Sequence, residues 1–367
     1  MNKKIRIIGA IAVAVIWFAL CLGAWLLPPE EISDAERRKL AQFPELSAET
    51  LLSGKFMSEF ETYSLDQFPL RDNFRQLKAL FHYHVLGQKD NNDIILFDGY
   101  AAKQEYPLNE HSVQKALDKF RSIYDKYLAG SGSRVFAAVV PDKMAYLPKH
   151  SGYLTMDYDR LFHMVEEGMD YASFVNLRDD LGIEHYYRTD THWRQEELLK
   201  AAGTLCEALG VTIPEAEDYT VTALEQPFYG VYYGQAALPM EPETMYILEN
   251  DLLAECLVTN YETGKTSAVY DMEKLTSRDL YDVFLSGAVA LQTIENPNAK
   301  TDRELIVFRD SFGSSMIPLL IHDYATVTVI DIRYVSSDFL GQLVDFHGQD
   351  VLFLYSTLVL NNSATLK

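Results

Sequence analysis

Cysteine is scarce in this sequence, with only three residues among 367. No CxxC pair and no cluster of cysteine with histidine is present, and structural zinc or iron–sulfur sites need such clusters. We therefore expect neither a bound metal nor a cofactor. Cys21 lies in an apolar N-terminal segment, and the sequence leaves open whether Cys206 and Cys256 pair.

Positive charge is also scarce, because 32 Lys and Arg residues face 53 Asp and Glu residues, for a net charge of −21. Such a surface repels nucleic acid and anionic lipid. It also disfavours a strongly anionic polymer as substrate unless a local basic pocket compensates. We therefore expect no nucleic-acid partner.

Charge is absent from residues 7–27, which follow the basic N-terminal tail at residues 1–6. As a helix, these 21 or so residues would be about 32 Å long, enough to cross a bilayer. The basic tail predicts a cytoplasmic N-terminus and a C-terminal part outside. A cleaved signal peptide is the alternative, but the apolar run is long for one and no A-x-A site follows. We favour an uncleaved, single-pass signal-anchor in the cell membrane.

The rest of the chain divides by composition. Residues 28–75 are polar and proline-containing, which is typical of a stalk with short helices. We assign residues 76–367 to one α/β domain, in which residues 211–300 are rich in Tyr, Thr and Val and predict a β-rich insertion. Apolar patterns predict helices at 111–130 and 194–210 and a buried strand at 134–140.

A regular alternation begins at residue 304. Strands are predicted at 304–308, 326–331 and 351–356, and helices at 315–324 and 338–346. Short apolar runs that alternate with helices indicate a parallel sheet with helices on its faces.

The stretch "YYRTDTHW", residues 186–193, places Asp190 two residues before His192. In an extended chain these side chains point to the same side, so the carboxylate can orient the imidazole while its other nitrogen acts as a base. A D-x-H spacing also arises by chance in purely structural segments. A nucleophile elsewhere would decide between the two.

Ser311 is the candidate nucleophile. In "LIVFRDSFGSS", Asp310 and Ser311 follow a predicted strand and precede a predicted helix, which is where open α/β sheets bind ligands. Ser311 as a helix N-cap is the alternative, since serine is favoured there.

These segments together resemble a known family. "RDSFG" (309–313) looks like the nucleophile block of SGNH-type esterases, but here Asp190-Thr191-His192-Trp193 precedes the serine. That order resembles the alginate O-acetyltransferase-like SGNH proteins, and above all the DHHW proteins. Further segments occur in the order that such proteins show: "ERRKLAQFPELS" (36–47), "FETYSLDQFPLRD" (60–72), "VVPDK" (139–143), "DLYDVFLSG" (279–287) and "VIDIRY" (329–334).

The resemblance implies an SGNH-like, flavodoxin-like fold in which Ser311 is the nucleophile, His192 the base and Asp190 its orienter. It places Arg333 and Tyr334 of "DIRY" near the site, although an ion pair at an element end explains Arg333 equally well. Lys143 either lines the cleft or is a solvated loop lysine, and Asp310 is a further candidate for the cleft lining.

Two further positions follow from the same resemblance. Trp193 either packs in the core or forms a sugar-stacking wall beside His192. After "FLSG", relatives often carry Asn where this chain has Ala288. If that Asn donates to an oxyanion, backbone N–H groups or another side chain must do so here.

Three functions are compatible with these residues. The first is a membrane-anchored O-acetyltransferase that acts on a cell-surface or secreted polysaccharide, for which the resemblance implies a multi-spanning membrane acyltransferase as acetyl supplier. The second is an esterase that removes acetyl groups. The third is a non-catalytic polysaccharide-binding or assembly protein.

Overall fold

The computed structural model describes residues 3–33, 35–147, 151–212 and 215–367. Residues 1–2 of the expected tail, residue 34 of the expected stalk and residues 213–214 of the expected insertion lie outside the described residues. The chain divides into two compact units. The first holds residues 1–92 and 233–240, and the second holds residues 93–232 and 241–367.

The first unit begins with helix α1 (Lys3–Leu26), 24 residues with a mean hydropathy of 2.6 and no buried residue. In the described part of the chain it is the one helix long and apolar enough to cross a membrane. It starts earlier than the apolar run because lysine and arginine are good helix formers.

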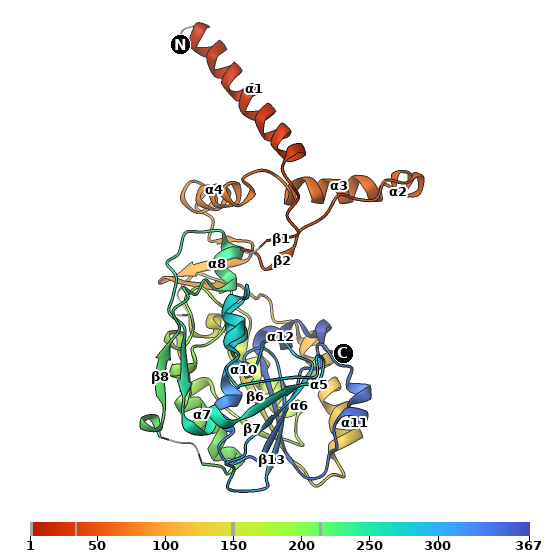
Figure 1. The fold of residues 1–367 in the computed structure, drawn as a ribbon, viewed down its shortest axis with the longest axis vertical. Coiled ribbons are helices and arrows are strands. Elements are labelled where there is room, and N and C mark those ends of the chain that lie inside the picture. The colour runs from red at the N-terminus through yellow and green to blue at the C-terminus, as the bar shows by residue number, and fades with distance from the viewer. Residues whose placement is uncertain (1–2, 34, 148–150, 213–214) are drawn as a thin grey trace. The chain divides into compact units, whose positions relative to one another are not determined.

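Three more helices follow in the first unit (Figure 1), which reaches Asn92, beyond the stalk limit expected at residue 75. An antiparallel pair, β1 and β2, precedes them. The bounds are β1 (Ile32–Ser33), β2 (Arg38–Lys39), α2 (Ala48–Leu52), α3 (Lys55–Asp66), α4 (Arg71–His84) and β3 (Asp90–Asn91).

The second unit is built on an eight-stranded sheet of order β11-β10-β12-β14-β13-β15-β6-β7. The five strands from β14 to β7 run parallel, as predicted, but β12, β10 and β11 add an antiparallel edge, so the sheet is mixed. The bounds are β6 (Arg134–Val140), β7 (Ser173–Val175), β10 (Leu257–Asn260), β11 (Lys265–Ser267), β12 (Leu291–Glu295), β13 (Glu304–Arg309), β14 (Thr326–Ile330) and β15 (Asp350–Ser356).

Alternation along the central strands creates two cores. In β6, Phe136, Ala138 and Val140 pack into one core, and Val135, Ala137 and Val139 pack into the other. Successive side chains of a strand point to opposite faces, so a sheet covered on both faces needs a continuous apolar run. That is why "RVFAAVV" reads as unbroken apolar sequence.

Helices cover the two faces. Residues of α5 (Glu110–Ile123) and α6 (Tyr158–Gly168) pack into one core, and residues of α7 (Leu199–Leu209) and α10 (Gly313–Met316) pack into the other (Figure 1). The helix predicted at 315–324 instead turns into a 3₁₀-helix at Ile317–Leu320. Pro318 has no N–H to donate to Ser314, so the α-helical pattern ends there.

Shorter elements complete the second unit. The predicted helix at 338–346 shortens to four residues, because the backbone becomes extended at Val344. The remaining elements are β4 (Ile94–Phe97), β5 (Tyr100–Lys103), β8 (Thr220–Ala223), β9 (Tyr246–Glu249), α9 (Asp251–Glu255), α11 (Leu340–Leu343) and α12 (Thr357–Asn361), with α8 (Val231–Ala236) at the boundary between the units.

Candidate active site

The loop at residues 185–194, which we call the histidine loop, doubles back on itself. Tyr187 donates its backbone N–H to His192 O at 3.1 Å, and Arg194 donates to His185 O at 2.8 Å. The segment predicted as extended is therefore a hairpin-like loop. Its tip carries the Asp190-Thr191-His192 triplet.

The Asp190 carboxylate holds His192 in place. Its Oδ1 lies 2.6 Å from His192 Nδ1 and also accepts the backbone N–H of His192 at 3.0 Å. Its Oδ2 accepts the backbone N–H of Val231 at 2.7 Å. Asp190 is fully buried, so these donors replace the water that an ionised carboxylate needs.

The other nitrogen of the imidazole, Nε2, lies 2.8 Å from Ser311 Oγ. The His192 ring is stacked on Tyr281, with 3.8 Å between centroids and 6° between planes. The structure thus brings Asp190, His192 and Ser311 into one hydrogen-bonded chain, although His192 and Ser311 are 119 positions apart. Such an order of acid, base and hydroxyl is the arrangement of a nucleophilic triad.

The turn that carries Ser311 connects β13 to α10. Phe312 is the N-cap residue of α10, so the hydroxyl of Ser311 is not engaged in capping. Asp310 is buried and accepts backbone N–H groups from Phe312 at 3.0 Å and from Ser356 at 2.7 Å. Asp310 therefore braces the turn against the end of β15 and offers no carboxylate to a cleft.

Lys143 holds the histidine loop by hydrogen bonds to its backbone. It is buried, and its Nζ donates to the carbonyl oxygens of Asp190 at 2.6 Å and Tyr187 at 2.9 Å. Both alternatives weighed from the sequence, a cleft lysine and a solvated lysine, differ from this role. Nζ also donates to Arg188 O at 3.4 Å. Burial lowers the pKa of Lys143 to about 7, and a neutral amine still has two N–H donors for the two nearer carbonyls.

This burial predicts a pH-dependent stability. The unfolded chain holds the Lys143 proton up to its ordinary pKa of 10.5, whereas the folded chain releases it near 7. Because the unfolded state binds more protons between these pH values, stability from this group rises with pH across that window. The free energy of unfolding of the wild type, relative to that of Lys143→Met, should increase from pH 7 to pH 10 in urea titrations. A constant difference would show that Lys143 stays protonated when folded.

A buried polar network joins Trp193, which follows His192, to Tyr281, which stacks on the His192 ring. Trp193 Nε1 donates to Phe312 O at 3.1 Å and to Ser315 Oγ at 2.9 Å. Ser315 Oγ also lies 2.7 Å from the hydroxyl of Tyr281. The Trp193 ring is fully buried, so it ties the histidine loop to α10 and has no face to offer a sugar.

Arg309, the last residue of β13, connects this strand to the turn that precedes Ala288. It is fully buried and donates to Gly287 O at 2.8 Å and to Ser314 Oγ at 3.1 Å. Burial lowers its pKa, while Asp331, 3.9 Å away, opposes that change. Ala288 itself is exposed.

In the "DIRY" segment, Arg333 and Asp331 form an ion pair just after the end of β14. Arg333 binds Asp331 in a two-pronged manner, with Nε to Oδ1 at 2.9 Å and Nη2 to Oδ2 at 2.6 Å. Asp331 is fully buried, whereas Tyr334 is half exposed. The Arg333 side chain is therefore held by Asp331 of the same segment.

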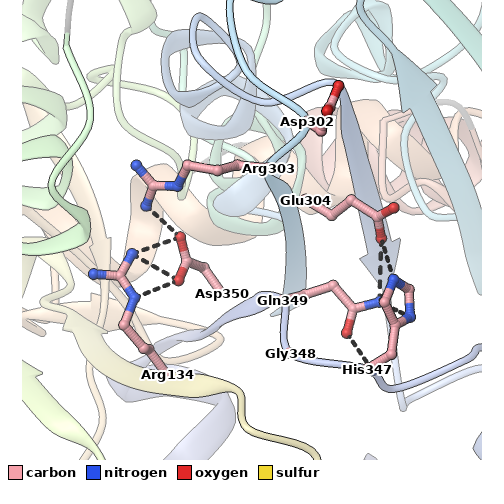
Figure 2. A pocket seen from close by; sticks show the side chains of 8 residues that line it. All are labelled: Arg134, Asp302, Arg303, Glu304, His347, Gly348, Gln349 and Asp350. Atoms are coloured by element: carbon pink, nitrogen blue, oxygen red, sulfur yellow. Dashed lines mark hydrogen bonds and ion pairs between the residues drawn. The ribbon is translucent and has the colours of Figure 1, made fainter.

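A separate hollow of about 490 Å³ lies at the amino ends of β6, β13 and β15 (Figure 2). Arg134 and Arg303 both bind Asp350 there, at 2.8 and 2.5 Å. Ser311 follows the carboxyl end of β13, so this hollow is at the opposite edge of the sheet from the triad. Its two arginines face three acidic residues in the lining, namely Asp302, Glu304 and Asp350, which makes it a poor site for an anionic ligand.

Sequence reasoning missed three residues that the site uses, namely Tyr281, Ser315 and Arg309. Tyr281 and Gly287 both belong to the "DLYDVFLSG" segment, whose similarity to DHHW proteins was the available signal. Arg309 and Ser315 flank the "DSFG" turn, but nothing in the sequence marks them as buried.

Comparisons with known proteins agree with this architecture. A Pseudomonas syringae pv. tomato protein named "Probable alginate O-acetylase AlgJ" is 25% identical over 260 residues, or 66% of this chain. The match spans 62% of that relative's length. A DHHW family protein from Eubacterium siraeum has a similar fold, with 23% identity, a TM-score of 0.61, and coverage of 75% of this chain and 95% of that one.

Bacillus cereus PatB1, solved with a sulfonyl adduct, also shares the fold, with 18% identity and a TM-score of 0.55. The alignment covers 73% of this chain and 97% of PatB1. Residues 156–330, which contain Asp190, His192 and Ser311, match the DHHW protein family, and this confirms the resemblance to DHHW proteins inferred from the sequence.

Proposed function

We propose that this protein is a membrane-anchored serine O-acetyltransferase that acts on a cell-surface or secreted polysaccharide. The observation that carries the proposal is the hydrogen-bonded series from Asp190 through His192 to Ser311, at 2.6 and 2.8 Å. The name of the Pseudomonas syringae relative, an alginate O-acetylase, supports acetyl as the group and a polysaccharide as the acceptor.

The reaction proceeds in two halves. Ser311 Oγ attacks the carbonyl carbon of an acetyl donor while His192 Nε2 takes the hydroxyl proton. Asp190 stabilises the imidazolium and fixes its orientation. The carbon–oxygen bond to the leaving group then breaks, His192 returns the proton to that group, and Ser311 carries the acetyl ester.

In the second half, a polysaccharide hydroxyl gives its proton to His192 and attacks the acetyl carbonyl. The bond between the acetyl carbon and Ser311 Oγ breaks as the sugar ester forms, and Ser311 recovers its proton from His192. Developing negative charge on the carbonyl oxygen needs hydrogen-bond donors. Ala288 has no side-chain donor, and the N–H groups of Asp310, Phe312 and Gly313 in the "DSFG" turn already donate within the protein. We therefore assign this role to the backbone N–H of Ser311.

The acetyl donor must reach a domain outside the cytoplasm. The single helix α1 anchors the chain but cannot carry an acyl group across a bilayer. A multi-spanning membrane acyltransferase is therefore the partner that supplies acetyl to Ser311. Anchoring by α1 would keep this chain in the same membrane as that partner.

Hydrolysis is the second candidate, since the chemistry up to the acetyl-enzyme is shared. Ser311 is partly exposed, so water reaches the ester when no sugar occupies the site. The protein is a transferase if a polysaccharide hydroxyl attacks the acetyl-enzyme faster than water does, and an esterase if water attacks faster.

One experiment separates the candidate functions. The purified full chain in detergent is mixed with an aryl acetate, with and without a neutral oligosaccharide, and both aryl release and acetylated sugar are measured. A transferase gives acetylated oligosaccharide and faster aryl release when the sugar is present. An esterase gives the same aryl release with and without sugar, and a binding protein gives none, so either result would contradict the proposal.

A further inference from the structure

Helix α4 presents an apolar stripe to the outside of the first unit. The stripe consists of Phe74, Leu77 and Phe81, which are spaced by three or four residues and so lie on one side of the helix, together with the cap residues Leu70 and Val85 at its two ends. Their exposed fractions run from 43% at Phe74 to 66% at Leu70 and Val85. None of the five is charged. A surface helix of a water-soluble protein turns such a stripe toward the core.

The opposite side of α4 is the side that is buried. Ala79 has no exposed surface, and the side chains of Arg71 and Arg75 are each only 16% exposed. Both arginines form ion pairs with Glu36, and Arg75 also donates to Gly234 O at 2.8 Å. Polar contacts therefore fix the rotation of α4, with its charged side inward and its apolar side outward.

The stripe starts where α1 ends. A Cβ atom added to Gly23 of α1 would lie 3.2 Å from the Pro69 side chain. Leu27, Pro69 and Leu70 line one hollow of the first unit, and Figure 1 shows α1 ending beside the α3–α4 connection. Trp25, two residues before Leu27, is 77% exposed, as expected of a tryptophan at a membrane–water interface.

We infer that α4 lies in the interface of the membrane that α1 spans, with its stripe directed at the acyl chains. The inference depends on the anchoring by α1 proposed above. An amphipathic helix parallel to the bilayer buries its apolar side at the boundary between headgroups and acyl chains. With a net charge of −21, the occupant that fits is the apolar zone of the bilayer, since anionic headgroups would be repelled.

The test uses the full chain in vesicles of phosphatidylcholine and phosphatidylethanolamine. Cys21 is replaced by serine, and single cysteines are introduced at Leu77 and Phe81 for an environment-sensitive fluorophore. Gln76→Cys is the matched control, because Gln76 is an exposed neighbour that lies about 100° around the helix from Leu77. Quenching is measured with a water-soluble quencher and with lipids brominated on their acyl chains.

At positions 77 and 81 we expect a blue-shifted emission, several-fold weaker quenching from water than at position 76, and quenching by brominated lipid. Equal quenching from water at all three positions would overturn the inference. It would indicate that a partner protein, which the vesicles do not contain, covers the stripe. Protection from both quenchers would also overturn it, because a second copy would then cover the stripe.

Flotation of the vesicles after an alkaline wash reports on α1 separately. If the protein floats but the stripe remains in water, the anchor stands and the interfacial helix fails. Introducing Leu77→Glu should abolish the lipid quenching at position 81, whereas Gln76→Glu should leave it unchanged. An unchanged folded-state circular dichroism spectrum verifies that both variants fold.

Discussion

Replacing Ser311 by alanine is expected to lower the rate of aryl acetate cleavage by roughly 10³- to 10⁶-fold. The change removes the atom that forms the acetyl-enzyme and little volume. Because Ser311 does not cap α10, the free energy of unfolding should change by no more than about 1 kcal/mol, the worth of its one hydrogen bond to His192. Initial rates and urea titrations measure the two quantities.

The matched control is Ser173→Ala, an exposed serine in β7 that should retain the full rate. His192→Ala should be about as damaging as Ser311→Ala, and the double variant should be no slower than either, because the two residues act as a unit. Mass spectrometry of the wild type after mixing with an activated ester should find one acetyl group on Ser311. Acetylation of another residue, with full activity in Ser311→Ala, would identify a different nucleophile.

Gly230→Ala is expected to damage both stability and rate, although Gly230 lies outside the triad. A Cβ atom there would lie 2.3 Å from the backbone of Thr189 and Asp190. The backbone cannot move away easily, because the Gly230 N–H donates to Thr189 Oγ1 at 3.0 Å and the next N–H, that of Val231, holds Asp190. We expect a loss of about 3 kcal/mol in the free energy of unfolding and loss of most of the activity, since Asp190 would be displaced.

Gly203→Ala provides the comparison. Gly203 lies in α7, and a Cβ atom there meets nothing within 4 Å. That variant should gain about 0.5 to 1 kcal/mol, because alanine restricts the unfolded chain and favours a helix. Denaturant unfolding and aryl acetate rates of both variants check the pair. Wild-type values for Gly230→Ala would mean that the loop at 185–194 tolerates displacement.

The parallel part of the sheet was predictable because local patterns encode it. Buried strands such as residues 134–140 and 304–308 read as continuous apolar runs whatever their neighbours are. The antiparallel edge was not predictable, since a run of four or five residues such as Leu257–Asn260 carries no mark of its direction. That direction depends on pairing with β12, more than thirty residues away.

The same division applies to the candidate site. The D-x-H triplet and the serine after a strand are local patterns, so the sequence points to Asp190, His192 and Ser311. The groups that hold the histidine loop come from distant segments, such as the buried Lys143 and the Glu243 carboxylate, which accepts from Thr189 N and Oγ1 at 2.8 Å. Nothing local in the sequence shows that either residue lies beside the loop.

The apolar period of α4 is likewise visible in the sequence, but its outward rotation is not. Burial of Arg71 and Arg75 depends on Glu36, which lies in a segment that looks like a polar stalk. A tertiary ion pair thus overrides the usual rule that the apolar side of a helix faces inward.

The acid and the base of the candidate triad lie on one short loop, whereas the serine lies on a distant segment. Asp190 and His192 are bonded to each other through both side chain and backbone, so they move together. The Nε2–Oγ contact is the one place where two distant segments meet within the triad. Because Trp193 also bonds the loop to Phe312 and Ser315, a shift of the loop relative to Ser311 would have to break these hydrogen bonds as well. In the proposed mechanism, the base and the serine hydroxyl are therefore already aligned before a substrate binds.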